Sequence, residues 1–116
     1  MINTYKINEL AFDEKANFLT GFANMQTLPI KEKGINSISL ADGPHGIRHE
    51  KEENCVSFPN LCSAAATFDS ELLYEMGVGL AKDCVEHDVD MLLGPGINIK
   101  RYANCGRNFE YMSEDP

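Results

Sequence analysis

The sequence predicts an α/β fold, in which helices and strands alternate in the order helix, strand, helix, strand. Two short apolar runs, 35–40 (INSISL) and 89–93 (VDMLL), are each followed within a few residues by Gly-Pro, as is typical of buried strands that end in tight turns. The segment after Asp69 has apolar residues at steps of three and four, which indicates a helix. A strand, a crossover helix and a second strand form a parallel βαβ unit, so both strands should end at one edge of a sheet.

The first predicted helix covers residues 12–22. Gly21 supplies a stop signal near its end, and residues 24–34 are interpreted as a connection because they hold Pro29 and Gly34 among polar residues. The apolar residues that share one face of this helix are Phe12, Ala16, Leu19 and Ala23.

The second predicted helix begins after Asp69, whose carboxylate can accept hydrogen bonds from free N–H groups of a first turn. It ends near His87, and its apolar stripe consists of Leu73, Met76, Leu80 and Cys84. Before it, residues 45–59 lack periodicity and include the charged run 49–53 (HEKEE), which predicts an exposed loop.

Composition favours one globular domain over residues 1–116, because 43% of the chain is hydrophobic and 24% is charged. The net charge of −8 argues against a nucleic-acid partner, since phosphate binding needs an excess of Lys and Arg. No apolar run approaches the roughly 20 residues that cross a membrane, and the first residues lack a signal-peptide pattern. The expected location is therefore cytoplasmic, with the four irregularly spaced cysteines as reduced thiols.

Three stretches together resemble the N-terminal region of family 3 glycoside hydrolases, the β-glucosidase and β-xylosidase type. They are 10–21 (LAFDEKANFLTG), 39–48 (SLADGPHGIR) and 92–116 (LLGPGINIKRYANCGRNFEYMSEDP). The resemblance implies a fragment of a (β/α)₈ TIM-type barrel, roughly its first two strand-helix units, because a full barrel needs about 250 residues. One departure is Ala11, which stands where the family usually has a Ser or Thr cap and could cost about 1 kcal/mol.

The resemblance implies that Asp42 and Arg101 bind the sugar in the subsite where cleavage occurs. A carboxylate can accept hydrogen bonds from two vicinal hydroxyls, and a guanidinium offers a fixed fork of donors, so a direct Arg101–Asp42 pair is also conceivable. Without the resemblance, Asp42 before Gly-Pro would be read as a turn former and Arg101 as a solvated strand end. Arg107 and Glu110, with the segment 113–116, are expected to support the loop rather than touch sugar.

No catalytic residue is assigned. The resemblance implies a nucleophilic aspartate on a later strand and an acid/base residue further along, and the chain contains neither segment, nor the family's Lys-His pair. No cofactor is expected. The spacing of His45, His49, Cys55 and Cys62 fits no zinc pattern, and Gly94-Pro95-Gly96 lacks the Gly-Lys-Ser/Thr ending of a phosphate loop.

The predicted function is therefore an N-terminal fragment of a retaining, β-glucosidase-like glycoside hydrolase that contributes sugar-binding residues and is inactive alone. Its expected partners are a β-linked glucoside or related glycoside, and either the remainder of the glycosidase chain or a second copy. The alternative is a non-catalytic carbohydrate- or partner-binding module derived from the barrel, which the unpaired strand edges of so short a piece would favour.

Overall fold

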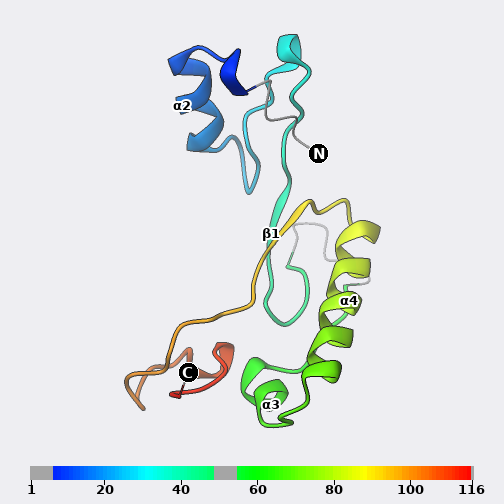
Figure 1. Ribbon diagram of the computed structural model, residues 1–116, viewed down its shortest axis with the longest axis vertical. Helices are drawn as coiled ribbons and strands as arrows, with labels where there is room; N and C mark the ends of the chain where they lie inside the picture. Colours follow the sequence, from blue (N-terminus) through cyan, green and yellow to red (C-terminus); the bar gives the residue numbers. More distant parts are fainter. Residues whose placement is uncertain (1–6, 49–54, 116) are drawn as a thin grey trace. The chain divides into compact units, whose positions relative to one another are not determined.

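The computed structural model describes residues 7–48 and 55–115, which fall into two compact units, Met1–Leu40 and Ala41–Pro116. The α/β class predicted from the sequence is confirmed. In chain order the elements are α2 (Phe12–Thr20), the 3₁₀ helix η1 (Lys31–Lys33), β1 (Leu40–Asp42), α3 (Leu61–Ala65), α4 (Ser70–Glu86), β2 (Met91–Leu93) and the 3₁₀ helix η2 (Asn108–Glu110), as drawn in Figure 1.

The first unit has a small core formed by Leu10, Ile30 and Ile35, against which Phe18 of α2 packs. The apolar face predicted for this helix is not a buried face, because Phe12 and Leu19 are each 83% exposed. The core is built instead on a turn. Ile30 and Ile35 exchange backbone hydrogen bonds of 2.9 and 3.1 Å around η1.

Because of this turn, the prediction of a strand over 35–40 is wrong in its extent. Ile35 pairs with Ile30 and Ser39 pairs with Gln26 through isolated bridges, and a regular strand begins only at Leu40. The strand β1 therefore covers Leu40–Asp42, and Asp42 lies at its C-terminal end.

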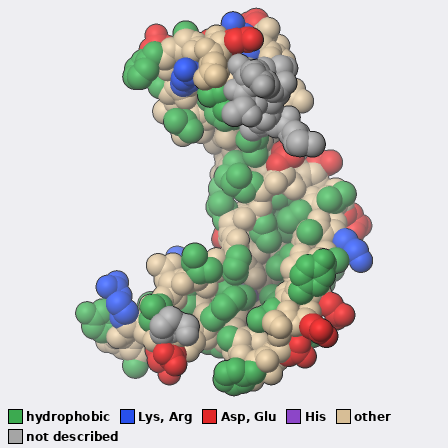
Figure 2. All heavy atoms as spheres, in the orientation of Figure 1, with side chains coloured by type: hydrophobic (Ala, Val, Ile, Leu, Met, Phe, Trp, Pro, Cys, Tyr) green, Lys and Arg blue, Asp and Glu red, His purple; other side chains and the backbone are tan. Residues whose placement is uncertain are grey.

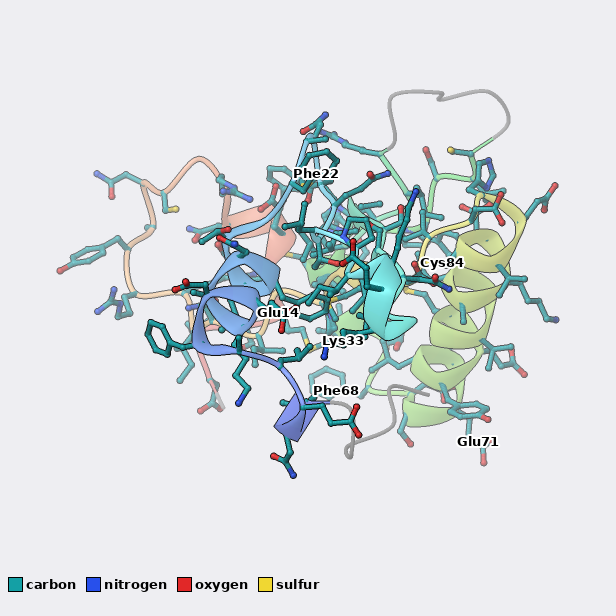
Figure 3. All side chains as sticks on the ribbon, turned by 90° about the horizontal axis from the view of Figure 1, so that it is seen from above. Glu14, Phe22, Lys33, Phe68, Glu71 and Cys84 are labelled. Atoms are coloured by element: carbon teal, nitrogen blue, oxygen red, sulfur yellow. The ribbon has the colours of Figure 1, made fainter. Side chains whose placement is uncertain are left out.

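The second unit contains a two-stranded parallel sheet of β1 and β2, connected through α4 as the βαβ pattern predicts. The helix α4 starts where expected, because the carboxylate of Asp69 accepts hydrogen bonds from the N–H groups of Glu71 and Leu72 at 3.0 and 3.1 Å. Ala41, Ile47 and Val89 form the core, and Cys84 packs against it from the side of α4 that faces the strands (Figure 3).

Burial along α4 differs from the expected pattern. Its apolar stripe is only half-buried, and the one buried residue is Asp83. One oxygen of that carboxylate lies 3.7 Å from Nδ1 of His87, and the other has no hydrogen-bond partner among the described residues. Hydrophobic side chains are plainly visible on the face shown in Figure 2, and Phe68, just before α4, is 96% exposed.

The prediction of an exposed loop over residues 45–59 is partly wrong. Ile47 is buried in the core because the chain doubles back after β1, while the charged run 49–53 lies outside the described residues. The short helix α3 follows this segment and was not predicted. Its N-cap is Asn60, whose side chain accepts a hydrogen bond from the N–H of Ser63 at 2.9 Å.

Two further findings concern the described part of the chain. None of its helices combines the length and the apolar character that a membrane span requires. None of its cysteines, Cys55, Cys62, Cys84 and Cys105, forms a disulfide bond.

Candidate functional site

The loops that follow β1 and β2 lie against each other, as expected for parallel strands. A Cβ atom added to Gly94, directly after β2, would lie 3.0 Å from Cα of Pro44, two residues after β1. Such an approach is tighter than most Cβ contacts, so a side chain at residue 94 would require the loop after β1 to shift. The carboxyl edge of the sheet therefore carries both predicted site segments, which is the usual position of ligand sites in parallel α/β folds.

The loop after β1 is a tight turn built around two glycines. The N–H of Arg48 donates to the carbonyl of Asp42 at 2.7 Å and closes the loop. Gly43 and Gly46 have φ values of 142° and 120°, and a Cβ on Gly43 would lie 1.8 Å from the carbonyl oxygen of Gly46. Only glycine combines this conformation with so close a backbone contact.

His45 fixes the same loop to the structure around it. Its Nε2 accepts a hydrogen bond from the N–H of Leu61 at 3.2 Å, and its carbonyl accepts one from the N–H of Phe58 at 2.8 Å. Its ring lies 5.7 Å from the ring of Phe109, measured between centroids. These three contacts to later segments thus hold the loop whose first residue after β1 is Gly43.

A pocket of about 210 Å³ opens beside this loop. Asp42, an exposed residue, lines one side and Glu110 of η2 lines another. The remaining lining residues are Gly43, Pro44, His45, Gly46, Ile47, Arg48, Cys55, Val56, Ser57, Phe58 and Phe109. This volume is below the several hundred Å³ that complete small-molecule pockets usually provide, so the described residues form a partial site.

Asp42 has no fixed partner in the part of the chain that the structure describes. Its backbone carbonyl bonds to Arg48, but its carboxylate makes no hydrogen bond or ion pair with a described residue. An exposed carboxylate at the carboxyl edge of a sheet can accept hydrogen bonds from a ligand without losing an existing one.

Arg107 and Glu110 form an ion pair at η2. Nε of Arg107 donates to Oε2 of Glu110 at 2.7 Å, and Nη2 contacts the same oxygen. This hydrogen bond raises the pKa of the Arg107 guanidinium above its ordinary value. The charges of Glu110, Tyr111 and Asp42 act in the same direction. Glu110 is thus the main partner of Arg107, and the influence of Asp42 on it is the smallest of these.

Arg101 is placed differently from Asp42. It is exposed, it does not line the pocket, and it makes no hydrogen bond or ion pair among the described residues. The conceivable direct pair with Asp42 is not formed in this structure. Its neighbour Lys100 holds the segment in place, since the N–H of Lys100 donates to the carbonyl of Ser113 at 3.1 Å.

Known glycosidases are similar to this chain in sequence and in structure. Thermostable beta-glucosidase B of Acetivibrio thermocellus is 40% identical over 120 residues, covering 95% of this chain and 16% of that protein. The crystal structure of the GH3 beta-glucosidase of Bifidobacterium adolescentis matches with a TM-score of 0.87 at 36% identity, covering 95% of this chain and 16% of that one. The chain belongs to glycoside hydrolase family 3.

A third comparison includes a bound sugar. Beta-glucosidase 3B of Thermotoga neapolitana, solved in complex with glucose, matches this family 3 chain with a TM-score of 0.83 at 34% identity, covering 97% of this chain and 19% of that one. The chain thus spans about a sixth of the length of the relatives it matches, in their N-terminal region. No family model matches the chain.

The larger cavity of this family 3 chain lies elsewhere. A groove of about 530 Å³ runs along the half-buried stripe of α4. Its lining is mainly apolar and includes Leu73, Met76, Leu80, Leu92 and Met112. Such a lining lacks the convergent polar groups that recognise sugar hydroxyls, so we place the candidate sugar site in the smaller pocket. Among the described residues, no cluster of His, Cys, Asp and Glu could hold a metal ion.

Sequence reasoning missed two pocket residues of the family 3 chain. The sequence motifs do not mark Phe109, and the His and Cys spacing raises only a metal-binding role for His45, whereas the structure shows His45 bonded to α3. The available signal was the position of His45 between Gly43 and Gly46 in a loop after a strand, because binding residues lie disproportionately on such loops.

Proposed function

We propose that this chain supplies part of the sugar-binding site of a β-glucosidase-like retaining glycoside hydrolase, built as the first two strand-helix units of a (β/α)₈ barrel. Asp42 and Arg101 bind hydroxyl groups of the sugar in the cleavage subsite. The observation that carries the proposal is the unpaired carboxylate of Asp42, exposed in a pocket at the carboxyl edge of a parallel sheet. Active sites of such barrels lie at this edge.

The chemistry of Asp42 suits this role. Its two oxygens can accept hydrogen bonds from neighbouring hydroxyls, and charged acceptors bind more strongly than neutral ones. Arg107 and Glu110 are assigned a supporting role in the loop, since their side chains are hydrogen-bonded to each other.

Arg101 completes the proposed site only together with segments that this chain does not contain. Its guanidinium is exposed and has no partner among the described residues, so its five donors are available to a ligand. Sugar binding by this chain alone therefore depends mainly on Asp42.

Hydrolysis needs more than these residues. A retaining glycosidase uses two carboxyl groups about 5 to 5.5 Å apart, one as nucleophile and one as acid and base. Glu110 is paired with Arg107, and the exposed Glu114 and Asp115 belong to the segment with an expected supporting role. The chain alone is therefore proposed to be inactive, with the nucleophile and the acid/base residue supplied by the remainder of the enzyme.

Two measurements test the proposal. The purified chain is incubated with a panel of p-nitrophenyl glycosides, and we expect no turnover above a heat-denatured sample. Clear turnover would show that Glu110, Glu114 or Asp115 acts catalytically and would overturn the assignment.

Sugar binding is measured separately by NMR titration with glucose. Asp42→Asn should raise the Kd about tenfold or more, because hydrogen bonds to charged groups contribute about 1.5 to 3 kcal/mol. Asp13→Asn, an exposed acid in the first unit, is the matched control and should leave the Kd unchanged. Equal affinities for both variants would remove Asp42 from the site.

A second candidate function is a non-catalytic module that binds a protein partner or a second copy. The half-buried apolar groove along α4 favours it, because burying such a surface stabilises association. Sedimentation velocity distinguishes the two. Self-association weakened by Leu80→Glu, but not by Asp42→Asn, would support the module, and a monomer at all concentrations would contradict self-association through the groove.

A further inference from the structure

The thiol of Cys62 lies at the meeting point of three segments. Nζ of Lys100 is 2.7 Å from its sulfur, and the carbonyl oxygens of Asn108 and Tyr111 are 3.3 and 3.4 Å away. Cys62 belongs to α3, Lys100 to the stretch after β2, and Asn108 to η2. A thiol and a primary amine, two nucleophiles, are therefore in direct contact.

Of Cys62, Cys84 and Cys105, only Cys62 has such a contact with a described residue. Cys84 and Cys105 have no amine contact within the described residues. Cys62 and Lys100 are both half-buried, so neither residue is sealed off from solvent and the amine has limited freedom. Such proximity converts a reaction between two side chains into an intramolecular step.

We propose that Cys62 and Lys100 form a modification site at which hydrogen peroxide creates a covalent sulfur–nitrogen bond, a sulfenamide, between α3 and the segment that carries Arg101. Neither residue is used in the proposed sugar binding, so the inference does not depend on that function. Sulfenic acids are known to condense with nitrogen in this way.

The reaction has two steps. The thiolate of Cys62 attacks one oxygen of peroxide, the O–O bond breaks and hydroxide leaves, so sulfur is oxidised by two electrons and peroxide is reduced. The deprotonated Nζ of Lys100 then attacks sulfur. The S–N bond forms, the S–O bond breaks, and the departing hydroxide takes a proton from nitrogen as water. In sum, one thiol, one amine and one peroxide give one sulfenamide and two waters.

The cross-link would restrain the residue next to Arg101. Lys100 is already tied to Ser113 through its backbone, and the new bond would tie its side chain to α3. A thiol reductant would break the S–N bond and restore both side chains, so the site would be reversible.

The test treats the whole chain with hydrogen peroxide at mildly alkaline pH, because both steps of the reaction need deprotonated nucleophiles. Intact-mass measurement should show the loss of two hydrogen atoms, and peptide mapping should join Cys62 to Lys100. Dithiothreitol should reverse the change. Cys62→Ser and Lys100→Arg should both abolish it, while Cys105→Ser, at an exposed thiol, should retain it.

Two outcomes would overturn the proposal. Addition of oxygen atoms at Cys62 without loss of two hydrogens would show that oxidation occurs but that Lys100 does not trap it. Loss of two hydrogens that persists in Lys100→Arg would identify a disulfide instead. Arginine keeps the positive charge beside sulfur, so this variant separates amine chemistry from electrostatic stabilisation.

Discussion

Nε2 of His45 accepts a hydrogen bond from the backbone N–H of Leu61 at 3.2 Å, so the loop after β1 holds the first residue of α3. The first N–H groups of a helix have no partner within it, and His45 satisfies one of them. Its other ring nitrogen must then carry the proton. The loop beside Asp42 and the helix that carries Cys62 are thereby joined through one side chain.

Loss of this contact should destabilise the second unit. His45→Ala removes the acceptor and the ring contact with Phe109, and we expect the free energy of unfolding to fall by about 1 to 2 kcal/mol. Urea unfolding followed by circular dichroism measures the change. His87→Ala, at the end of α4, is the control. Hydrogen exchange of the Leu61 amide should be faster in His45→Ala and unchanged in His87→Ala.

Gly46 should not tolerate a side chain. A Cβ atom there would lie 2.2 Å from the carbonyl oxygen of Val56, and its φ of 120° is strained for any other residue. Gly46→Ala should therefore cost at least about 2 kcal/mol of stability. The matched control is Gly106→Ala, where a Cβ would meet nothing within 4 Å. Similar midpoints in urea for the two variants would contradict the loop geometry.

Gly77 should be replaceable with a gain in stability. It lies within α4, and a Cβ there meets no atom within 4 Å, so Gly77→Ala should stabilise the helix by about 0.5 to 1 kcal/mol. Gly79 is the control in the same helix, because its Cβ would lie 2.9 Å from the ring of Phe58. The melting temperature of Gly77→Ala should be higher than that of Gly79→Ala. The reverse order would contradict the observed packing of α4, in which Gly79 and not Gly77 faces Phe58.

Ala11 should be improved by an oxygen-bearing side chain. The backbone at Ala11 has the extended conformation of an N-cap, and its N–H already donates to Glu14 at 2.7 Å, which is one half of a capping box. Ala11→Ser would supply the other half and should add about 1 kcal/mol. Ala16→Ser, inside α2, should instead lower stability slightly. Urea unfolding of the first unit compares the two variants.

Cys84 should make stability depend on alkaline pH. Burial, followed by the charge of Asp83, raises the pKa of its thiol above the ordinary value of 9.0. A group whose pKa is raised by folding contributes stability below its unfolded pKa and loses it as pH rises through the folded value. Stability should therefore decline above about pH 9, and Cys84→Ala should flatten this decline. At pH 8, iodoacetamide should react with Cys84 more slowly than with the exposed Cys105.

The sequence predicted the elements whose signals are local. The start of α4 followed from Asp69, and β2 followed from an apolar run closed by Gly94. The strand at 35–40 was misplaced because Ile35 is used in a turn with Ile30, and such a partner cannot be read from composition. The five-residue α3 is too short to show a helical period.

Some residues of the candidate site could likewise be predicted from local sequence signals, and others could not. Asp42 was found through a motif, and the structure places it with Glu110 in one pocket. The bond from Leu61 to His45 could not be predicted, because it requires the position of an unrecognised helix. The contact between Cys62 and Lys100 likewise depends on how three segments meet.

The pocket wall also has a consequence for biosynthesis. Asp42 and Glu110 line one pocket from opposite ends of the second unit, so the wall contributed by η2 reaches the ribosomal exit long after the loop beside Asp42. Chains fold progressively during synthesis at about 5 to 20 residues per second. For several seconds the nascent polypeptide therefore exposes the loop beside Asp42 before η2 has left the ribosomal tunnel, so the pocket cannot form until both segments have emerged.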